Sequence, residues 1–589
     1  MRALLLLLVL AFASSGCFGS TAGPKTEGHD KVGLLSFGPP LPDPLADGPF
    51  KFSIKEYDQG MIKVGGRTHE HKNYTYDAKL RGVLFTPEGP GPFPVLVFLH
   101  GQHPTCGFAG REQIVASPLA SCDTAGEPWH VYPNHRGYDY LGKHLASHGF
   151  VVASINGKEV NDRNGQGDIG MWARGELIIG TLDLLREAHE GTKDLGLAGK
   201  LDLDRIGIMG HSRGGEGVVT ATHVNALRTD PYNIRAVIPL APTDFNYRGV
   251  KGSALLSILP YCDGDVYSLH GLRTYDHSRF VDDAAKVQIV VFGTNHNNYN
   301  SQWGRMVGGV VPDGDDSLMF SRHNNPDCDV PQARGGGKLS LDDVYREATL
   351  HIGGFFRWVV GNETALAPYF QGDAAMPAKV CPGGAGPCPN AVRVTSVLPG
   401  RNWIFNVTKD GVGRGAVSLE GFSATNHCSM SRCAGNVYSY AWALDLTWNQ
   451  PATLHAALPE GHLVGMDAIA FRAGLYSWGK SNDPRMPVDA SVVLIDRAGQ
   501  GHSQRVSAHS KALAPPPGEV IEETTPTGTF ARVGETKVTY NMVRLPLSAF
   551  DVDPADVVAM EIRFDQTKSG RILIADAWAQ PEHRLALAD

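Results

Sequence analysis

The sequence predicts two folded domains: an α/β domain whose mostly parallel sheet is covered by helices on both faces, and then an all-β sandwich domain. Three observations support this prediction. The chain has 589 residues, more than a single hydrophobic core usually serves. Up to about residue 371, apolar strand-like runs alternate with amphipathic segments. Beyond a joint rich in proline, glycine and cysteine, short alternating strands recur without long helical stretches.

The α/β domain is expected from its apolar runs and the amphipathic segments between them. Several runs are almost wholly apolar, as parallel strands covered on both faces must be. Strands are expected at Leu80–Thr86, Val95–Leu99, Val151–Ile155, Ile206–Met209, Ala236–Leu240, Leu255–Leu259 and Ile289–Phe292. Helices are expected at Gly137–His148, Met171–His189 and Val344–Val360.

The second domain is expected from short strands in which apolar and polar residues alternate. This period is typical of antiparallel sheets with one buried face, and it favours a jelly-roll-like sandwich. The strands are expected at Val392–Val397, Tyr440–Trp448, Met466–Arg472, Ser491–Ile495, Val538–Leu545, Val557–Phe564 and Arg571–Ala577.

The N-terminus carries a targeting signal. Arg2 precedes an apolar stretch, Ala3–Ala13, which is too short to cross a bilayer and is typical of an export signal. Small residues then lead to Cys17, as in a bacterial lipoprotein signal, although Ser14 stands where leucine is usual. We expect an exported protein that is secreted, periplasmic or held at the outer surface by a lipid on Cys17.

These features divide the chain into five parts. Residues 1–17 form the signal and 18–49 a flexible linker. Residues 50–375 form the catalytic α/β domain, 376–389 a second linker, and 390–589 the β-sandwich.

The cysteines predict disulfide bonds. Nine are present, and removal of Cys17 leaves eight, an even number that fits an oxidising compartment. Proximity in the sequence favours Cys106–Cys122, Cys381–Cys388 and Cys428–Cys433, which leaves Cys262–Cys328. No cluster has zinc-ligand spacing, so no metal site is expected.

The charge balance excludes one class of partner. The formal net charge is −8, and charged residues make up 19% of the chain. Nucleic-acid-binding domains usually carry a basic surface, so we expect no nucleic-acid partner.

The segment Gly210-His211-Ser212-Arg213-Gly214-Gly215 is the strongest functional signal. It follows the apolar run that begins at Ile206 and precedes the helix-like segment Gly217–Thr222. A strand, a G-x-S-x-G turn and a helix in this order predict a nucleophile elbow, whose strained central residue needs glycines beside it. Ser212 is therefore the candidate nucleophile.

A serine nucleophile needs a base and an acid that orients the base, and each should follow a later strand. His296 follows the strand expected at Ile289–Phe292 and is the candidate base. Asp265, after the preceding strand, is the first candidate for the acid. Asp263 in the same turn and Asp244, one strand earlier, are the alternatives.

Two backbone N–H groups are expected to bind the oxyanion of an acyl-transfer reaction. One belongs to Arg213, directly after the nucleophile, and the other to Gln102 in the loop after Val95–Leu99. Arg213 and Glu216 stand three residues apart at the expected start of the helix and are expected to form an ion pair.

These motifs resemble the α/β-hydrolase superfamily. The resemblance covers about Leu80–Gln371 and is carried by Val95–His100, Gly210–Gly215, Pro260–Val266 and Gly293–Asn298. The elbow is similar to that of chlorophyllases, and Tyr138–Asn156 resembles the dienelactone-hydrolase and cutinase-like polyester-hydrolase branch. The resemblance implies Ser212, Asp265 and His296 as a catalytic triad, with backbone donors at Gln102 and Arg213.

Two departures from the polyester hydrolases argue against a polyester substrate. Those enzymes usually carry methionine where Arg213 stands, and Gly304–Lys338 is an added segment. The C-terminal phrases Val543–Phe550 and Ile574–Trp578 resemble galactose-binding-like jelly rolls attached to secreted carbohydrate-active enzymes. These phrases form the core of the sandwich, so the resemblance implies the fold more than sugar binding, and carbohydrate is a candidate ligand of that domain.

We therefore expect a secreted or surface-anchored serine esterase that forms an acyl-enzyme and needs no cofactor. A polysaccharide- or lipid-linked ester is the expected kind of substrate. The alternatives are a serine peptidase or thioesterase on the same fold, or a non-catalytic surface carbohydrate-binding protein whose hydrolase domain has decayed.

Overall fold

The computed structural model describes most of the two domains. It covers residues 41–67, 73–108, 111–114, 122, 129–163, 168–303, 328, 339–372, 374–388, 391–433, 439–475, 481–485, 488–516, 520–526, 528–533 and 537–581. The expected signal at residues 1–17, most of the linker 18–49 and nearly all of the added segment 304–338 lie outside this range. Within it, no helix is both long enough and apolar enough to cross a membrane.

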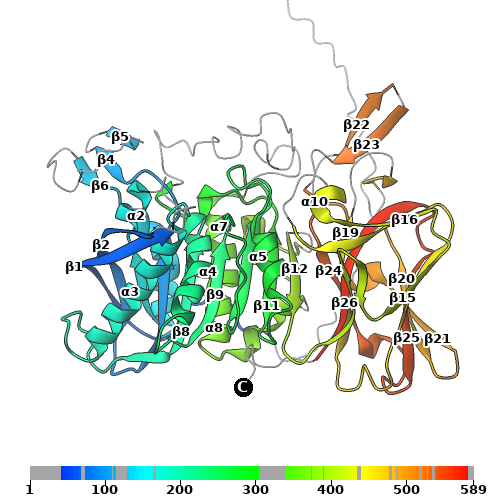
Figure 1. Cartoon of the computed structure of the whole chain (residues 1–589), viewed down its shortest axis with the longest axis horizontal. Helices are drawn as coiled ribbons and strands as arrows, with labels where there is room; N and C mark the ends of the chain where they lie inside the picture. Colours follow the sequence, from blue (N-terminus) through cyan, green and yellow to red (C-terminus); the bar gives the residue numbers. More distant parts are fainter. Residues whose placement is uncertain are drawn as a thin grey trace, which may run out of the picture.

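The first domain is built on a nine-stranded sheet, drawn in blue to green in Figure 1. Its order is β1-β2-β7-β3-β8-β9-β10-β11-β12, and the six strands from β7 to β11 are mutually parallel. The strands are β1 (Phe52–Arg67), β2 (Asn73–Pro87), β3 (Phe93–Leu99), β7 (Val151–Ile155), β8 (Leu201–His211), β9 (Ile234–Leu240), β10 (Ala254–Pro260), β11 (Lys286–Val291) and β12 (Val392–Val397). A small separate sheet holds β4 (Cys106–Phe108), β5 (Arg111–Ile114) and β6 (Trp129–Val131).

Helices cover both faces of this sheet. The main helices are α1 (Asp139–Ser147), α2 (Lys158–Asp162), α3 (Met171–His189), α4 (Arg213–Ala226), α5 (Gly271–Ser278), α7 (Leu341–Ala348), α8 (Gly354–Val359) and α9 (Pro368–Gln371). Short helical turns are η1 (Asn134–Tyr138), η2 (Asn297–Tyr299), η4 (Thr349–Gly353), η5 (Thr364–Leu366) and η6 (Pro382–Gly384). Elements α7, η4 and α8 run without a break, close to the helix expected at Val344–Val360.

The alternation of side chains along the central strands explains the two layers. In β3, Leu96 and Phe98 face the core formed with α1 and α8, whereas Val95, Val97 and Leu99 face the core formed with α3 and α4. Both sets are buried, because successive residues of a strand point to opposite faces. The apolar runs in the sequence are therefore strands covered on both sides.

The second domain consists mainly of two antiparallel sheets, drawn in yellow to red in Figure 1. One sheet contains β13 (Asn402–Thr408), β14 (Gly411–Arg414), β16 (Ala424–Ser429), β17 (Trp442–Trp448), β19 (Ala468–Leu475), β24 (Asn541–Pro546) and β26 (Gly570–Gln580). The other contains β15 (Ala416–Glu420), β18 (Ala452–Ala457), β20 (Ser491–Asp496), β21 (Gly501–Arg505) and β25 (Val557–Phe564). Apolar side chains from both sheets form one shared core.

Minor elements complete this domain. They are the hairpin β22 (Val520–Thr525) and β23 (Gly528–Val533), which projects from the domain in Figure 1, and the short helices α10 (Met430–Cys433), α11 (Val506–His509) and η8 (Leu547–Ala549). A β-rich second domain is thus present, as expected from the sequence.

The boundary between the domains differs from the expected one. Val392–Val397, expected as the first strand of the sandwich, is β12 and pairs antiparallel with β11 at the edge of the first sheet. The expected linker 376–389 also packs on the first domain, because Val380 is buried in its core. At the other end, the Gly48 N–H donates to Ser147 Oγ (2.8 Å). The described end of the linker 18–49 is therefore also attached to the first domain.

The four expected disulfides are all present. They join Cys106 to Cys122, Cys262 to Cys328, Cys381 to Cys388, and Cys428 to Cys433. The second bond ties Cys328 to the loop after β10.

A buried ionic network crosses the interface between the domains. Arg472 on β19 contacts Asp276 of α5 (2.9 Å) and Asp576 on β26 (3.4 Å). Arg279, just after α5, contacts the same two carboxylates at 3.0 and 2.9 Å. Burial alone would raise the pKa of Asp276, but Arg472 and Arg279 outweigh it and hold that pKa below its usual value. A buried network of charged side chains therefore joins the two domains.

Replacement of Arg472 by methionine is expected to lower the free energy of unfolding by about 3–5 kcal/mol, because two buried carboxylates lose a partner. Urea denaturation measures the effect. Arg497→Met is the matched control, since Arg497 pairs with Glu460 at the exposed surface and should leave the midpoint unchanged. Equal urea midpoints for Arg472→Met and the wild type would show that the buried ionic network does not stabilise the fold.

Candidate active site

Ser212 lies at a sharp turn between β8 and α4, as the elbow motif predicts. Its backbone has φ of 58° and ψ of −124°, a conformation that non-glycine residues rarely adopt and that costs about 1–3 kcal/mol. The Ser212 N–H donates to the Leu240 carbonyl (2.9 Å), and the Thr243 N–H donates to the Ser212 carbonyl (3.2 Å). Bonds to the neighbouring strand loop therefore hold the strained residue in place.

The glycines of the elbow allow the close packing that this turn needs. A Cβ atom on Gly210 would lie 1.9 Å from the Gly214 carbonyl oxygen, and one on Gly214 would lie 2.5 Å from the Leu99 carbonyl oxygen. A Cβ atom on Gly215 would meet Pro242 at 2.8 Å. The glycines therefore leave room for the neighbouring backbone and for the Pro242 ring, so larger residues would displace the elbow.

The loop after β3 passes directly beside Ser212. A Cβ atom on Gly101 would lie 2.5 Å from Ser212 Cβ and 2.8 Å from the His211 carbonyl oxygen. His100 fixes this loop, because its Nε2 accepts from the Gly157 N–H and its Nδ1–H therefore donates to the Gly101 carbonyl, both at 2.9 Å. Burial lowers the pKa of His100 to about 3, so its ring stays neutral.

Gly101→Ala is expected to lower kcat/KM at least about tenfold, because the added methyl group must push the loop away from Ser212. Ester hydrolysis measures the loss, and circular dichroism confirms the fold. Gly354→Ala is the matched control, since its Cβ atom would lie at an ordinary 3.4 Å from Phe370. If both variants retain wild-type activity, the close contact between Gly101 and Ser212 is not needed for hydrolysis.

His296 and Asp263 form a buried hydrogen-bonded pair. His296 follows β11, and its Nδ1 lies 2.8 Å from Asp263 Oδ2; both side chains are at most 2% exposed. The other carboxylate oxygen, Oδ1, accepts from the N–H groups of Asp265 (3.0 Å) and Val266 (2.6 Å). The turn after β10 thus holds the carboxylate rigidly against the imidazole.

The first candidate for the acid does not match this geometry. Asp265 approaches Nε2 of His296, at 3.7 Å, rather than Nδ1, and its side chain is 63% exposed. Asp263, the second candidate, takes the orienting position instead. The third candidate, Asp244, pairs with Arg273 at 3.3 Å, and burial raises its pKa to about 7.

His211, beside the nucleophile, connects the elbow to the histidine loop. Its Nε2 donates to the His296 carbonyl (2.9 Å), and its Nδ1 accepts from the Tyr138 hydroxyl (3.0 Å). The rings of His211 and His296 lie 5.1 Å apart, and Trp303 packs on His211 at 4.7 Å. Burial holds the pKa of His211 well below its usual value, so its ring is neutral and joins the elbow to the His296 loop through a hydrogen bond. This role is not predicted from the sequence, in which the imidazole inside the elbow motif is its only signal.

The expected Arg213–Glu216 ion pair is not formed. Glu216 instead accepts from the Thr243 hydroxyl, the N–H groups of Phe245 and Asn246, and the Asn246 side chain, at 2.6–3.0 Å. These bonds fasten α4 to the loop after β9. The Arg213 side chain is left beside the elbow, where burial lowers its pKa.

The two expected oxyanion donors belong to the two segments that meet at Ser212, the start of α4 and the loop after β3. Arg213 is the first residue of α4, so its N–H is among those that an α-helix leaves without an intrahelical partner. The Gly101 carbonyl accepts from Asn161 Nδ2 at 2.9 Å. The N–H of Gln102, on the opposite side of the same trans peptide, therefore points away from Asn161. Their oxyanion role stays a prediction.

The carboxyl edge of the parallel sheet thus gathers the candidate residues. Ser212 follows β8, Asp263 follows β10 and His296 follows β11. A strained serine, an imidazole and a buried carboxylate at one sheet edge provide the groups that nucleophilic acyl transfer requires.

The chain resembles known ester hydrolases over this region. Residues 132–306 match the family model described as PET hydrolase-like, a segment that contains Ser212, Asp263, Asp265 and His296 and begins after Gln102. The resemblance to the α/β-hydrolase superfamily and its cutinase-like branch is thereby confirmed. The resemblance of the second domain to galactose-binding-like jelly rolls stays a prediction.

Curated relatives agree with the family model. The chain is 30% identical to the bis(hydroxyethyl) terephthalate hydrolase of Streptomyces coelicolor over 156 residues, 26% of this chain and 44% of that protein. It is 32% identical to cutinase est2 of Thermobifida alba over 153 residues, 26% of this chain and 45% of that protein. For cutinase est1 of the same organism the identity is 32% over 108 residues, 18% and 30% of the two chains. The chain therefore spans less than half the length of these relatives.

Proposed function

We propose that this protein is a serine hydrolase of carboxylic esters, with Ser212 as the nucleophile, His296 as the base and Asp263 as the orienting acid. The observation that carries the proposal is the strained serine at the same sheet edge as the buried His296–Asp263 pair. The similarity to a cutinase and a terephthalate ester hydrolase supports esters, rather than amides or thioesters, as the substrate class.

The reaction follows from the roles of these groups. Ser212 Oγ attacks the ester carbonyl carbon, and Nε2 of His296 accepts the hydroxyl proton. The N–H groups of Gln102 and Arg213 stabilise the oxyanion of the tetrahedral intermediate. The carbon–oxygen bond to the alcohol then breaks, and His296 protonates the departing alkoxide. His296 then takes a proton from water, whose oxygen attacks the acyl-enzyme carbonyl; the bond to Ser212 Oγ breaks, His296 returns the proton to Oγ, and the acid is released.

Asp263 keeps His296 in the productive tautomer. Its carboxylate accepts the Nδ1–H, so Nε2 carries the lone pair that takes the serine proton. When His296 becomes an imidazolium ion, the same carboxylate stabilises the positive charge. This set of groups completes the reaction without a cofactor or metal ion.

The setting of the enzyme is part of the proposal. The expected export signal at residues 1–17 and the four disulfides support a protein that acts outside the cytoplasm, either secreted or anchored through Cys17. A polysaccharide- or lipid-linked ester is the proposed natural substrate. Carbohydrate binding by the second domain stays a prediction, which retention on insoluble polysaccharide would test.

Hydrolysis by the full chain tests the proposed activity. The panel contains p-nitrophenyl esters from acetyl to palmitoyl, methyl glucuronate and feruloyl esters, bis(hydroxyethyl) terephthalate, and a matched p-nitroanilide and thioester. We expect turnover of oxygen esters, with slower or no turnover of the anilide and the thioester. A folded protein that hydrolyses none of the esters contradicts the proposal, and a preference for the anilide would make it a peptidase.

A further inference from the structure

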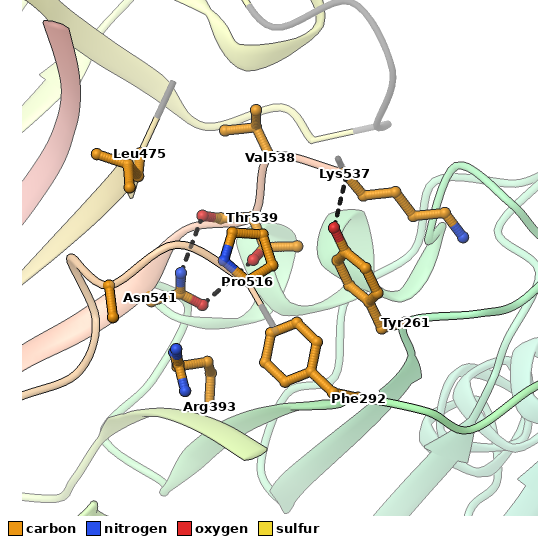
Figure 2. A pocket seen from close by; sticks show the side chains of 10 residues that line it. Tyr261, Phe292, Arg393, Leu475, Pro516, Lys537, Val538, Thr539 and Asn541 are labelled. Carbon is orange, nitrogen blue, oxygen red and sulfur yellow. Dashed lines mark hydrogen bonds between the residues drawn. The ribbon is translucent and has the colours of Figure 1, made fainter. Parts of the chain in front are cut away.

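The second domain reaches the candidate catalytic acid directly. Lys537, in the segment before β24, donates from Nζ to the main-chain carbonyl of Asp263 at 2.8 Å. Its backbone N–H donates to the Tyr261 hydroxyl at 3.0 Å, a contact drawn in Figure 2. These two bonds span 274 and 276 residues of sequence and hold the turn that carries Asp263.

The contact belongs to an extensive shared interface. Leu259, Tyr261 and Leu272 of the first domain pack in one apolar cluster with Val538, Tyr540 and Leu573 of the second. The ionic network between Asp276, Arg279, Arg472 and Asp576 lies in the same interface and fixes α5, the helix that follows the acid turn. The two domains are therefore joined on both sides of the turn after β10.

From this arrangement we infer that Lys537 is a positioning residue for the catalytic acid, and that the second domain thereby contributes to the geometry of the active site. The inference rests on the proposed function. Lys537 holds the Asp263 main chain, and the Asp263 carboxylate in turn orients His296. The chain of contacts runs from Lys537 Nζ to Asp263 O and from Asp263 Oδ2 to His296 Nδ1, each step 2.8 Å long.

A single charged group suits this task because the rest of the turn is held by other means. The Cys262 N–H donates to the Thr294 carbonyl at 2.9 Å, and Cys262 is bonded to Cys328. The N–H groups of Asp265 and Val266 hold the carboxylate itself. The Asp263 carbonyl, on the side facing the second domain, receives the lysine ammonium, and hydrogen bonds to a charged donor are among the stronger ones.

Lys537 can be changed without disturbing the packing around it. The side chain is only partly buried, at the rim of a pocket lined by residues of both domains, including Phe292 and Arg393 (Figure 2). Lys537→Met keeps the apolar stem and the backbone bond to the Tyr261 hydroxyl, and it removes only the ammonium group. Lys537→Arg keeps the charge and a donor near the Asp263 carbonyl.

We expect Lys537→Met to lower kcat for p-nitrophenyl acetate about 10- to 100-fold while KM stays within about twofold, because a shift of the acid affects the chemical step and not substrate binding. Lys537→Arg should recover most of the lost kcat. Lys568→Met, at an exposed lysine in another loop of the same domain, should match the wild type. Thermal midpoints of all variants should stay close to that of the wild type.

A double-mutant cycle with Asp263→Asn separates positioning from general weakening of the fold. If Lys537 acts through Asp263, Lys537→Met should change kcat less than about twofold in the Asp263→Asn background. An undiminished effect in that background, an unchanged kcat in the single variant, a loss confined to KM, or no recovery with arginine would each overturn the inference. These results require an active wild type, so an inactive wild type points instead to failure of the proposed function.

Discussion

Ser212→Ala is expected to lower ester hydrolysis by about 10⁴-fold or more, which is the largest effect of any substitution considered. The reason is that no acyl-enzyme can form without the hydroxyl group. Alanine carries the same Cβ atom as serine, so the strained backbone of the elbow is unchanged. The measurement is kcat/KM for p-nitrophenyl acetate together with the thermal unfolding midpoint.

Ser257→Ala is the matched control for this loss. Ser257 is also buried, lies on β10 of the same domain, and donates one hydrogen bond to the Gly271 carbonyl at 3.0 Å. Its loss is expected to affect stability slightly and hydrolysis hardly at all. An Ser212→Ala protein with wild-type hydrolysis would mean that another group is the nucleophile.

Asp263→Asn is expected to lower kcat by about 10³- to 10⁴-fold. The amide oxygen can still accept from the Asp265 and Val266 N–H groups, so the turn keeps its shape. The amide nitrogen, however, would face Nδ1 of His296 with a donor. His296 is then driven to the tautomer that carries its proton on Nε2, and it cannot accept the proton of Ser212.

Asp265→Asn provides the comparison that decides between the two neighbouring carboxylates. Asp265 lies mostly in solvent and near the other imidazole nitrogen, so its neutralisation is expected to change kcat by no more than about threefold. Both variants are assayed on the same ester over pH 5–9. A large loss in Asp265→Asn together with a small loss in Asp263→Asn would restore Asp265 as the acid.

Much of the first domain could be predicted from the sequence because its parallel strands are buried on both faces. The resulting apolar runs stand out, and β3, β7, β9 and β10 lie where they were expected. Strand β12 was misplaced for a physical reason. It is an antiparallel edge strand whose alternating pattern is the same as that of the sandwich strands, and only its pairing with β11 shows to which domain it belongs.

The loops that carry the candidate site could be predicted from the sequence, but which carboxylate contacts His296 could not. Asp263 and Asp265 are two residues apart in one turn, so strand order places both near His296. Only the turn itself, in which the Asp263 carboxylate accepts from two following N–H groups, decides which one meets Nδ1. The Glu216 bonds to the loop after β9 and the contact of Lys537 with Asp263 depend on tertiary packing, and no local pattern indicates them.

Covalent labelling with a fluorophosphonate probe shows whether Ser212 is an activated nucleophile, since the probe reacts with a serine only when a base activates it. We predict one label per folded chain, located by peptide mass spectrometry on Ser212, strongly reduced in His296→Ala and absent in Ser212→Ala. A folded wild-type protein that stays unlabelled, or that carries the label on a different residue, would contradict it.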